Sequence, residues 1–172
     1  MIGHILEKAR EYGAYDIRTI DPRKINVYQW VRMKCQFGCP IYNNNYTCPP
    51  NVPELDKVRE FFSEYRKGIL IELRGLETLD DQKKVQKIIL RLERDCFLDG
   101  YHKAFGIAAG PCHLCKSCKA INGRPCNDMG RRPSLESLGV DVYELANSSG
   151  FPLTPVKRKD EEYKSYGLLL LE

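Results

Sequence analysis

The sequence predicts an α+β or α/β fold in a single domain, with a small central sheet covered by helices. The 172 residues are 42% hydrophobic and 29% charged, a composition typical of a globular chain with a sizeable core. Short apolar runs that suit buried strands alternate with longer segments whose apolar residues recur at helical spacing. Cysteines gather in turn-rich loops at the ends of these elements, at about 35–53 and 110–133.

The first half of the chain opens with an amphipathic helix for which Gly13 is a natural stop. The segment NVYQWVRM alternates poorly between apolar and polar residues, and we expect it to be extended. Pro53 can open the next helix, because its missing N–H would be unpaired there in any case. The predicted elements are a helix over 2–12, a strand over 16–20, an extended segment over 26–33, a loop over 35–53 and a helix from Pro53.

The second half contains the clearest strand and helix signals. Gly68 precedes the apolar run ILIEL, which is typical of a buried strand. Thr78 and Asp81 have the spacing of a capping box at the start of a long helix. The predicted elements are strands over 69–73, 103–109 and 167–171, a helix from Thr78 to Gly100, a cysteine-rich loop to Pro133 and a short helix between Asp141 and Gly150.

Composition also limits the classes of partner that we expect. No apolar run approaches the roughly 18 residues that a membrane span needs, so no membrane partner is expected. The N-terminal segment is typical of an amphipathic helix and not of a signal peptide, which favours the cytoplasm. The net charge of +4 is too small to indicate a nucleic-acid-binding surface.

Eight cysteines are the unusual feature of the composition. A disulfide framework is typical of small secreted chains, whereas this chain has no export signal and enough core without covalent links. Cysteines separated by only two residues suit one shared ion or cluster better than pairing with each other. We therefore interpret seven of them as thiolate ligands in a reducing compartment. The eighth, Cys96, lies on the apolar stripe of a predicted helix and is expected in the core.

The C-terminal group has the more specific spacing. Cys112, Cys115 and Cys118 form C-x2-C-x2-C, and Cys126 follows after seven further residues. Three closely spaced thiolates can wrap one compact cubane, and bacterial ferredoxins use this spacing for a [4Fe–4S] cluster. Structural zinc sites prefer two separated C-x2-C pairs. The motif therefore favours an iron–sulfur cluster, and zinc is the alternative cofactor.

The N-terminal group has three members, Cys35, Cys39 and Cys48, with prolines after the last two. A metal site with three protein ligands keeps one coordination position open, and chemistry takes place at open positions. This group is therefore the strongest sequence indication of an activity. The alternative is that both groups form one shared site.

Four segments that contain these motifs resemble a known family: WVRMKCQFGCP, TCPP, GPCHLCKSC and RRPSLESLGVDVYE. The family is the predicted metal-binding proteins called domain of unknown function 2284, and the resemblance extends from about Trp30 to Glu144. It is a family that looks typical of archaea and anaerobic bacteria, which suits oxygen-sensitive clusters, and it implies no particular reaction. The resemblance implies a metal or iron–sulfur role for Cys35, Cys39, Cys48, Cys112, Cys115, Cys118 and Cys126.

Three functional hypotheses follow. The leading one is an iron–sulfur protein with two [4Fe–4S] clusters that transfers electrons to a redox partner protein. The second is a cluster-dependent enzyme, a lyase or a sulfur-transfer enzyme, whose open iron at the three N-terminal cysteines binds a small ligand. The third is a zinc-stabilised binding module. The sequence identifies no catalytic side chain for any of them.

Overall fold

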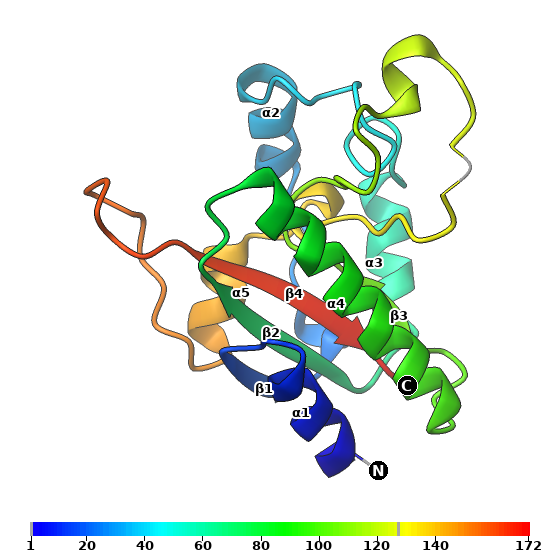
Figure 1. Ribbon diagram of the computed structural model, residues 1–172, viewed down its shortest axis with the longest axis vertical. Coiled ribbons are helices and arrows are strands. Elements are labelled where there is room, and N and C mark those ends of the chain that lie inside the picture. Colours follow the sequence, from blue (N-terminus) through cyan, green and yellow to red (C-terminus); the bar gives the residue numbers. More distant parts are fainter. Residues whose placement is uncertain (1, 127) are drawn as a thin grey trace.

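A computed structural model describes residues 2–126 and 128–172 of the chain (Figure 1). Within these ranges, four strands form one sheet in the order β1-β2-β4-β3, and every neighbouring pair is antiparallel. The fold is therefore α+β rather than α/β, and the predicted class is confirmed. The strands are β1 (Asp16–Ile20), β2 (Gly68–Arg74), β3 (Phe105–Ile107) and β4 (Lys164–Leu170).

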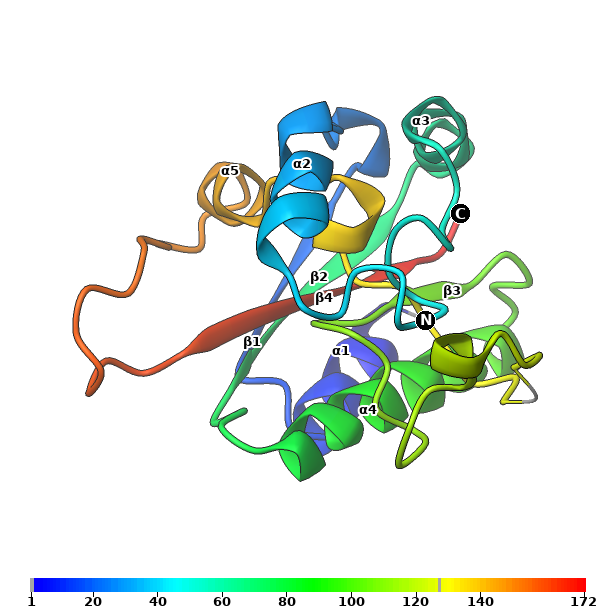
Figure 2. The same cartoon turned by 90° about the horizontal axis from the view of Figure 1, so that it is seen from above.

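Helices cover both faces of this sheet (Figure 2). Two of them, α1 (Ile2–Glu11) and α4 (Leu79–Leu98), lie on one face. The opposite face carries α2 (Gln29–Gly38), α3 (Leu55–Ser63) and α5 (Val142–Ser148). Short 3-10 turns link these elements: η1 (Pro22–Lys24), η2 (Lys119–Asn122) and η3 (Glu136–Leu138).

The central strand β2 is apolar on both sides because each side faces a helical layer. Ile69 and Ile71 pack with residues of α1 and α4 in one core, whereas Leu70 packs with residues of α3 in the other. Both ends of α4 follow from local sequence: Thr78 and Asp81 form the predicted capping box, and Gly100 follows the helix with a φ of 99°.

The helix α4 also anchors the base of the C-terminal loop, residues 109–131. Glu93 accepts a hydrogen bond from the backbone N–H of Gly106, at 2.6 Å, and forms an ion pair with Arg132. The backbone N–H of Ala108 donates to the carbonyl of Pro133, at 2.8 Å. One carboxylate on a rigid helix therefore fixes residues on both sides of the loop that contains four of the cysteines.

The predicted extended segment over 26–33 is wrong, because α2 begins at Gln29. Val31 is the one residue of this helix that is buried among those described. Trp30, Met33 and Phe37 instead expose 45%, 43% and 76% of their surface, so the chain offers no clear buried helical stripe to recognise. Consequently Cys35 lies in the last turn of a helix and not in the predicted loop.

Other differences are confined to element ends. The helix expected from Pro53 begins at Leu55, and the strand expected over 103–109 covers only Phe105–Ile107. The last strand begins at Lys164, earlier than expected, because it pairs with the whole of β2. The short helix predicted after Asp141 is α5, and Asp141 caps it by accepting bonds from two backbone N–H groups of its first turn.

Candidate metal centre

The four cysteines of the C-terminal loop line one small pocket of about 30 Å³. Tight backbone turns allow the loop to wrap in this way, since Gly110 and Gly123 have φ values of 74° and 61°. Asn45, Tyr46 and Thr47, from the N-terminal loop over residues 39–54, complete one wall. The predicted ligands Cys112, Cys115, Cys118 and Cys126 thus line one pocket.

A buried polar turn joins the two cysteine-bearing loops. The side-chain amide of Asn45 donates to the carbonyl of Cys112, at 2.9 Å, and the N–H of Cys112 donates to Thr47 Oγ1, at 3.0 Å. Asn45 Oδ1 in turn accepts bonds from the backbone and hydroxyl of Thr47. Asn45 and Thr47 are only 4% and 2% exposed, so their polar atoms depend on these partners. Cys112 is therefore positioned by residues more than 60 positions away in the sequence.

The N-terminal cysteines gather at the end of α2. Cys39 is the C-terminal cap of that helix, and its N–H donates to the carbonyl of Cys35 at 3.3 Å. Cys48 is buried in the turn that follows. Burial, with smaller contributions from Cys39, Cys35 and Cys118, raises the pKa of Cys48 to about 12. Cys48 follows Thr47, whose hydroxyl accepts from the N–H of Cys112, so the two cysteine groups are neighbours.

These thiols have to lose their protons before they can bind a metal. Burial raises the pKa of Cys35 and of Cys112 as well. A metal or cluster requires thiolates, so its binding displaces those protons. All eight cysteines are free thiols in the described structure.

Arg32 is a residue of this centre that the sequence analysis missed. It lies one helical turn before Cys35, and its charge lowers the pKa of that thiol against the effect of burial. One guanidinium nitrogen donates to the carbonyl of Pro53, at 2.8 Å, and thereby closes the N-terminal loop. Its Nε is buried and has no hydrogen-bond partner among residues 2–126 and 128–172. A buried, unpaired cationic donor beside thiols fits a negatively charged thiolate-bound group. The spacing Arg32-x2-Cys35 would have revealed this contact if α2 had been predicted as a helix.

Arg132, by contrast, is already engaged. Its place in the segment RRPSLE after the last cysteine allows a hydrogen bond to cluster sulfurs or to an anionic ligand. The structure directs its guanidinium to Glu93, with Nε 2.7 Å from the nearer carboxylate oxygen. Arg132 therefore supports the loop base.

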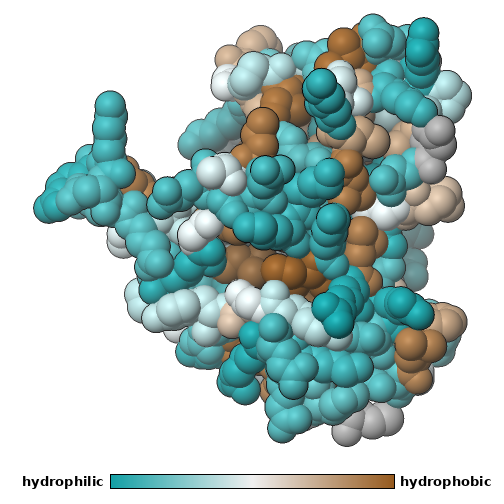
Figure 3. Space-filling model, viewed as in Figure 1, coloured by the Kyte–Doolittle hydropathy of each residue, from teal (hydrophilic) through white to brown (hydrophobic). Residues whose placement is uncertain are grey.

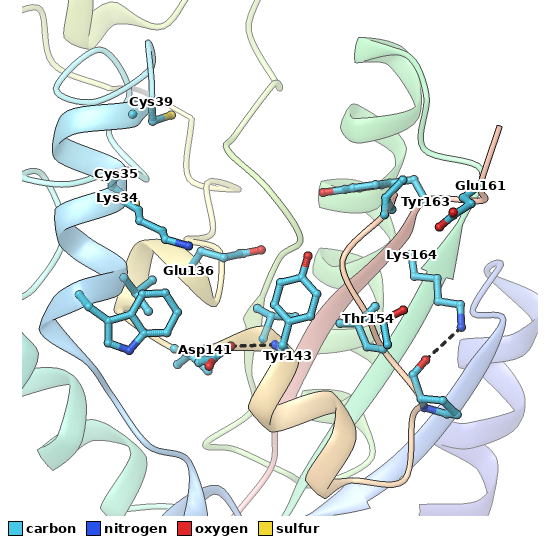
Figure 4. Close-up of a pocket in the computed structure, with 18 of the residues that line it drawn as sticks. Lys34, Cys35, Cys39, Glu136, Asp141, Tyr143, Thr154, Glu161, Tyr163 and Lys164 are labelled. Carbon is cyan, nitrogen blue, oxygen red and sulfur yellow. Dashed lines mark hydrogen bonds between the residues drawn. The ribbon is translucent and has the colours of Figure 1, made fainter. Parts of the chain in front are cut away.

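A larger cavity of about 410 Å³ opens beside Cys35 and Cys39 (Figure 4). Its other walls are η3, the start of α5 and an arm formed by residues 152–163. Figure 3 shows this arm projecting from the body with a mainly hydrophilic surface. Glu136 faces the cavity and remains accessible to solvent, yet surrounding protein atoms raise the pKa of its carboxyl. The N-terminal cysteines thus adjoin a space of the size that binds small molecules.

Cys96 lies in the core between α4 and α1 and is completely inaccessible to solvent. Burial raises the pKa of its thiol to about 12. This placement agrees with the expectation that Cys96 packs in the core.

The described residues contain no set of three or more His, Cys, Asp or Glu side chains already arranged around one metal ion. The fit of a metal group therefore depends on the donor chemistry: seven thiols in adjacent groups, with an unpaired guanidinium nitrogen beside them.

A family model matches residues 18–171 of the chain. The chain belongs to the predicted metal-binding protein family, domain of unknown function 2284. This finding confirms the family resemblance and supports a role in metal binding. Comparisons with curated proteins and with solved structures found no match. As in the sequence, no helix in the described part of this family member is long and apolar enough to cross a membrane.

We expect Thr47→Val to destabilise the metal-free protein by about 1–3 kcal/mol, because the N–H of Cys112 loses its acceptor, the buried hydroxyl of Thr47. Thr47→Ser keeps the hydroxyl and is the matched control, with a cost below about 1 kcal/mol. Urea unfolding under anaerobic, reducing conditions measures both. Equal stability of the valine and serine variants would show that this hydrogen bond does not hold the loops together.

Cys96→Ala should be less stable than the wild type at pH 7 and more stable than the wild type at pH 10. At pH 7 the lost packing costs about 1 kcal/mol. The folded pKa of about 12 lies above the unfolded value of about 8.5, so the contribution of the thiol is complete below pH 8.5 and is lost as pH rises toward 12. At pH 10 the wild type therefore loses about 2 kcal/mol that the variant keeps. Urea unfolding of both proteins at both pH values measures the free energies of unfolding. A difference between wild type and variant that is the same at pH 7 and pH 10 would contradict the burial of Cys96.

Proposed function

We propose that this protein binds [4Fe–4S] clusters in a reducing cytoplasm and transfers electrons to a redox partner protein. The observation that carries the proposal is the pocket shared by Cys112, Cys115, Cys118 and Cys126. Their spacing, C-x2-C-x2-C with a fourth cysteine from farther along the loop, suits a cubane. Such a cluster would supply one-electron redox chemistry, and the four thiolates would hold it.

Cys35, Cys39 and Cys48 are proposed to hold a second cluster. The unpaired Nε of Arg32 beside Cys35 supports an anionic group at this position. The hydrogen bond from the N–H of Cys112 to Thr47, which precedes Cys48, supports two centres that lie next to each other. Adjacent redox centres can exchange electrons directly, which is the arrangement that an electron carrier needs.

Access to a partner is supported at both groups. Cys39 and Cys115 are exposed, so neither proposed centre would be deeply buried. Lys116, Arg124 and Arg131 add positive charge to the C-terminal loop. A redox partner with an acidic surface would suit this loop, because opposite charges steer association.

A cluster-dependent enzyme is the second candidate, favoured by the cavity beside Cys35 and Cys39. Three thiolates leave one corner of a cubane for a small ligand, and the cavity gives such a ligand a place to bind. Lyase and sulfur-transfer chemistry both use an open iron. Zinc in place of iron would instead make the protein a structural binding module.

Protein purified without oxygen should be brown and contain iron and acid-labile sulfide in roughly equal amounts, because a cubane contains four of each. Metal and sulfide analysis measures this directly. The control is Cys96→Ala, which should keep all the iron because that thiol packs in the core. A colourless preparation with stoichiometric zinc would contradict the proposal.

The two candidates differ in whether one iron is exchangeable. For the enzyme, adding a small thiol should change the electron paramagnetic resonance spectrum of the N-terminal cluster alone, since four cysteines close the C-terminal one. Cys48→Ser should abolish that response and leave the C-terminal signal in place. A spectrum that does not change when the thiol is added would favour electron transfer without an enzymatic role.

A further inference from the structure

The cavity beside Cys35 and Cys39 has features that an electron carrier does not need. Its volume of about 410 Å³ lies within the range of about 300–1,000 Å³ that small-molecule sites occupy. Its walls are α2 and, about a hundred residues later, three consecutive segments: η3, the start of α5 and the arm. Figure 4 shows charged and aromatic side chains from these segments directed toward one space.

Two side chains of opposite charge on these walls lack a partner of opposite charge. Within the described ranges, neither Lys34 nor Glu136 forms an ion pair. The ammonium of Lys34 lies over the face of Trp30, 5.0 Å from the ring centroid. The other charged side chains of the cavity are engaged elsewhere: Asp141 caps α5, Glu161 accepts from the backbone of Lys157, Glu162 pairs with Arg74, and Lys164 donates to Pro152.

The remaining wall is largely apolar and aromatic. Trp30, Tyr143 and Tyr163 expose 45%, 44% and 58% of their surface, and Leu153 and Val156 also line the cavity. Exposed rings around a concave space are typical of sites that receive an apolar group. Tyr163 and Glu136 line the same cavity (Figure 4), and after burial the Glu136 carboxylate is the next cause that raises the pKa of the phenol. The carboxylate is therefore next to the aromatic wall.

We propose that this cavity binds an α-amino acid with an apolar side chain. The ligand carboxylate pairs with Lys34, its ammonium pairs with Glu136, and its side chain packs on the rings. A molecule with both charges and an apolar group satisfies all three features of the walls, whereas a simple anion or a simple amine leaves one charged side chain unpaired. The amino-acid site itself does not require the proposed clusters. Direct contact between the bound amino acid and an iron held by Cys35 and Cys39 would rest on the proposed function.

The test uses L-phenylalanine together with two analogues that each lack one charge. 3-Phenylpropionate lacks the ammonium, and 2-phenylethylamine lacks the carboxylate. Isothermal titration calorimetry of the wild type should show binding of phenylalanine and about ten- to a hundredfold weaker binding of each analogue, because each loses one charge-assisted contact.

Matched variants assign each contact. Lys34→Gln should weaken phenylalanine about ten- to a hundredfold and leave 2-phenylethylamine unchanged, whereas Glu136→Gln should leave 3-phenylpropionate unchanged. Lys87→Gln on α4 and Glu7→Gln on α1 are the controls, since both residues are exposed and lie on the other face of the sheet. Thermal unfolding verifies that all four variants fold.

Titrations of metal-free and iron-loaded protein separate this proposal from the proposed function. If the protein takes up no iron but binds phenylalanine, the amino-acid site is supported and the proposed clusters are wrong. An iron-loaded protein that does not bind phenylalanine, or that binds it equally well in Lys34→Gln and Glu136→Gln, would overturn the site and leave the clusters standing.

Discussion

The arrangement of the candidate centre depends on the buried hydrogen bonds between Asn45, Thr47 and Cys112. These bonds join a loop that follows α2 to a loop that follows β3, and the side chains of Asn45 and Thr47 that make them are buried. A buried N–H or amide without a partner would cost about 1–3 kcal/mol, so the loops are held in one relative position. The turn therefore holds Cys112 of the C-terminal group beside Thr47, the residue that precedes Cys48 of the N-terminal group.

The sheet and α4 supply the rigid base on which that turn acts. Glu93 holds the backbone of Gly106 and the guanidinium of Arg132, which lie before and after the C-terminal loop. Gly106 of β3 has to be glycine, since a Cβ there would lie 2.4 Å from a side-chain carbon of Ile89 in α4. Close packing of α4 on β3 thus places the start of the loop, and the Asn45–Thr47 turn places its first cysteine.

Local sequence was sufficient to predict elements whose signals are local. The apolar run of β2, the capping box at Thr78 and the core position of Cys96 needed only periodicity and capping chemistry. The helix α2 was missed because most of its apolar side chains face solvent or a cavity. A contact that holds it, from the guanidinium of Arg32 to the carbonyl of Pro53, joins residues 21 positions apart and leaves no local pattern. The contacts that make the two cysteine groups neighbours join residues far apart in the chain, and no local pattern records them. Cysteine spacing predicted the ligand sets, but neither the cavity nor the role of Arg32 could be inferred from it.

The central claim is that two cysteine groups held side by side carry two neighbouring clusters. Electron paramagnetic resonance of the fully reduced, anaerobic protein tests this claim most directly. Two clusters as close as the Asn45–Thr47 turn requires should interact magnetically and give a spectrum broader than the sum of the partly reduced signals. A single isolated cluster signal, or two signals that simply add, would contradict the account.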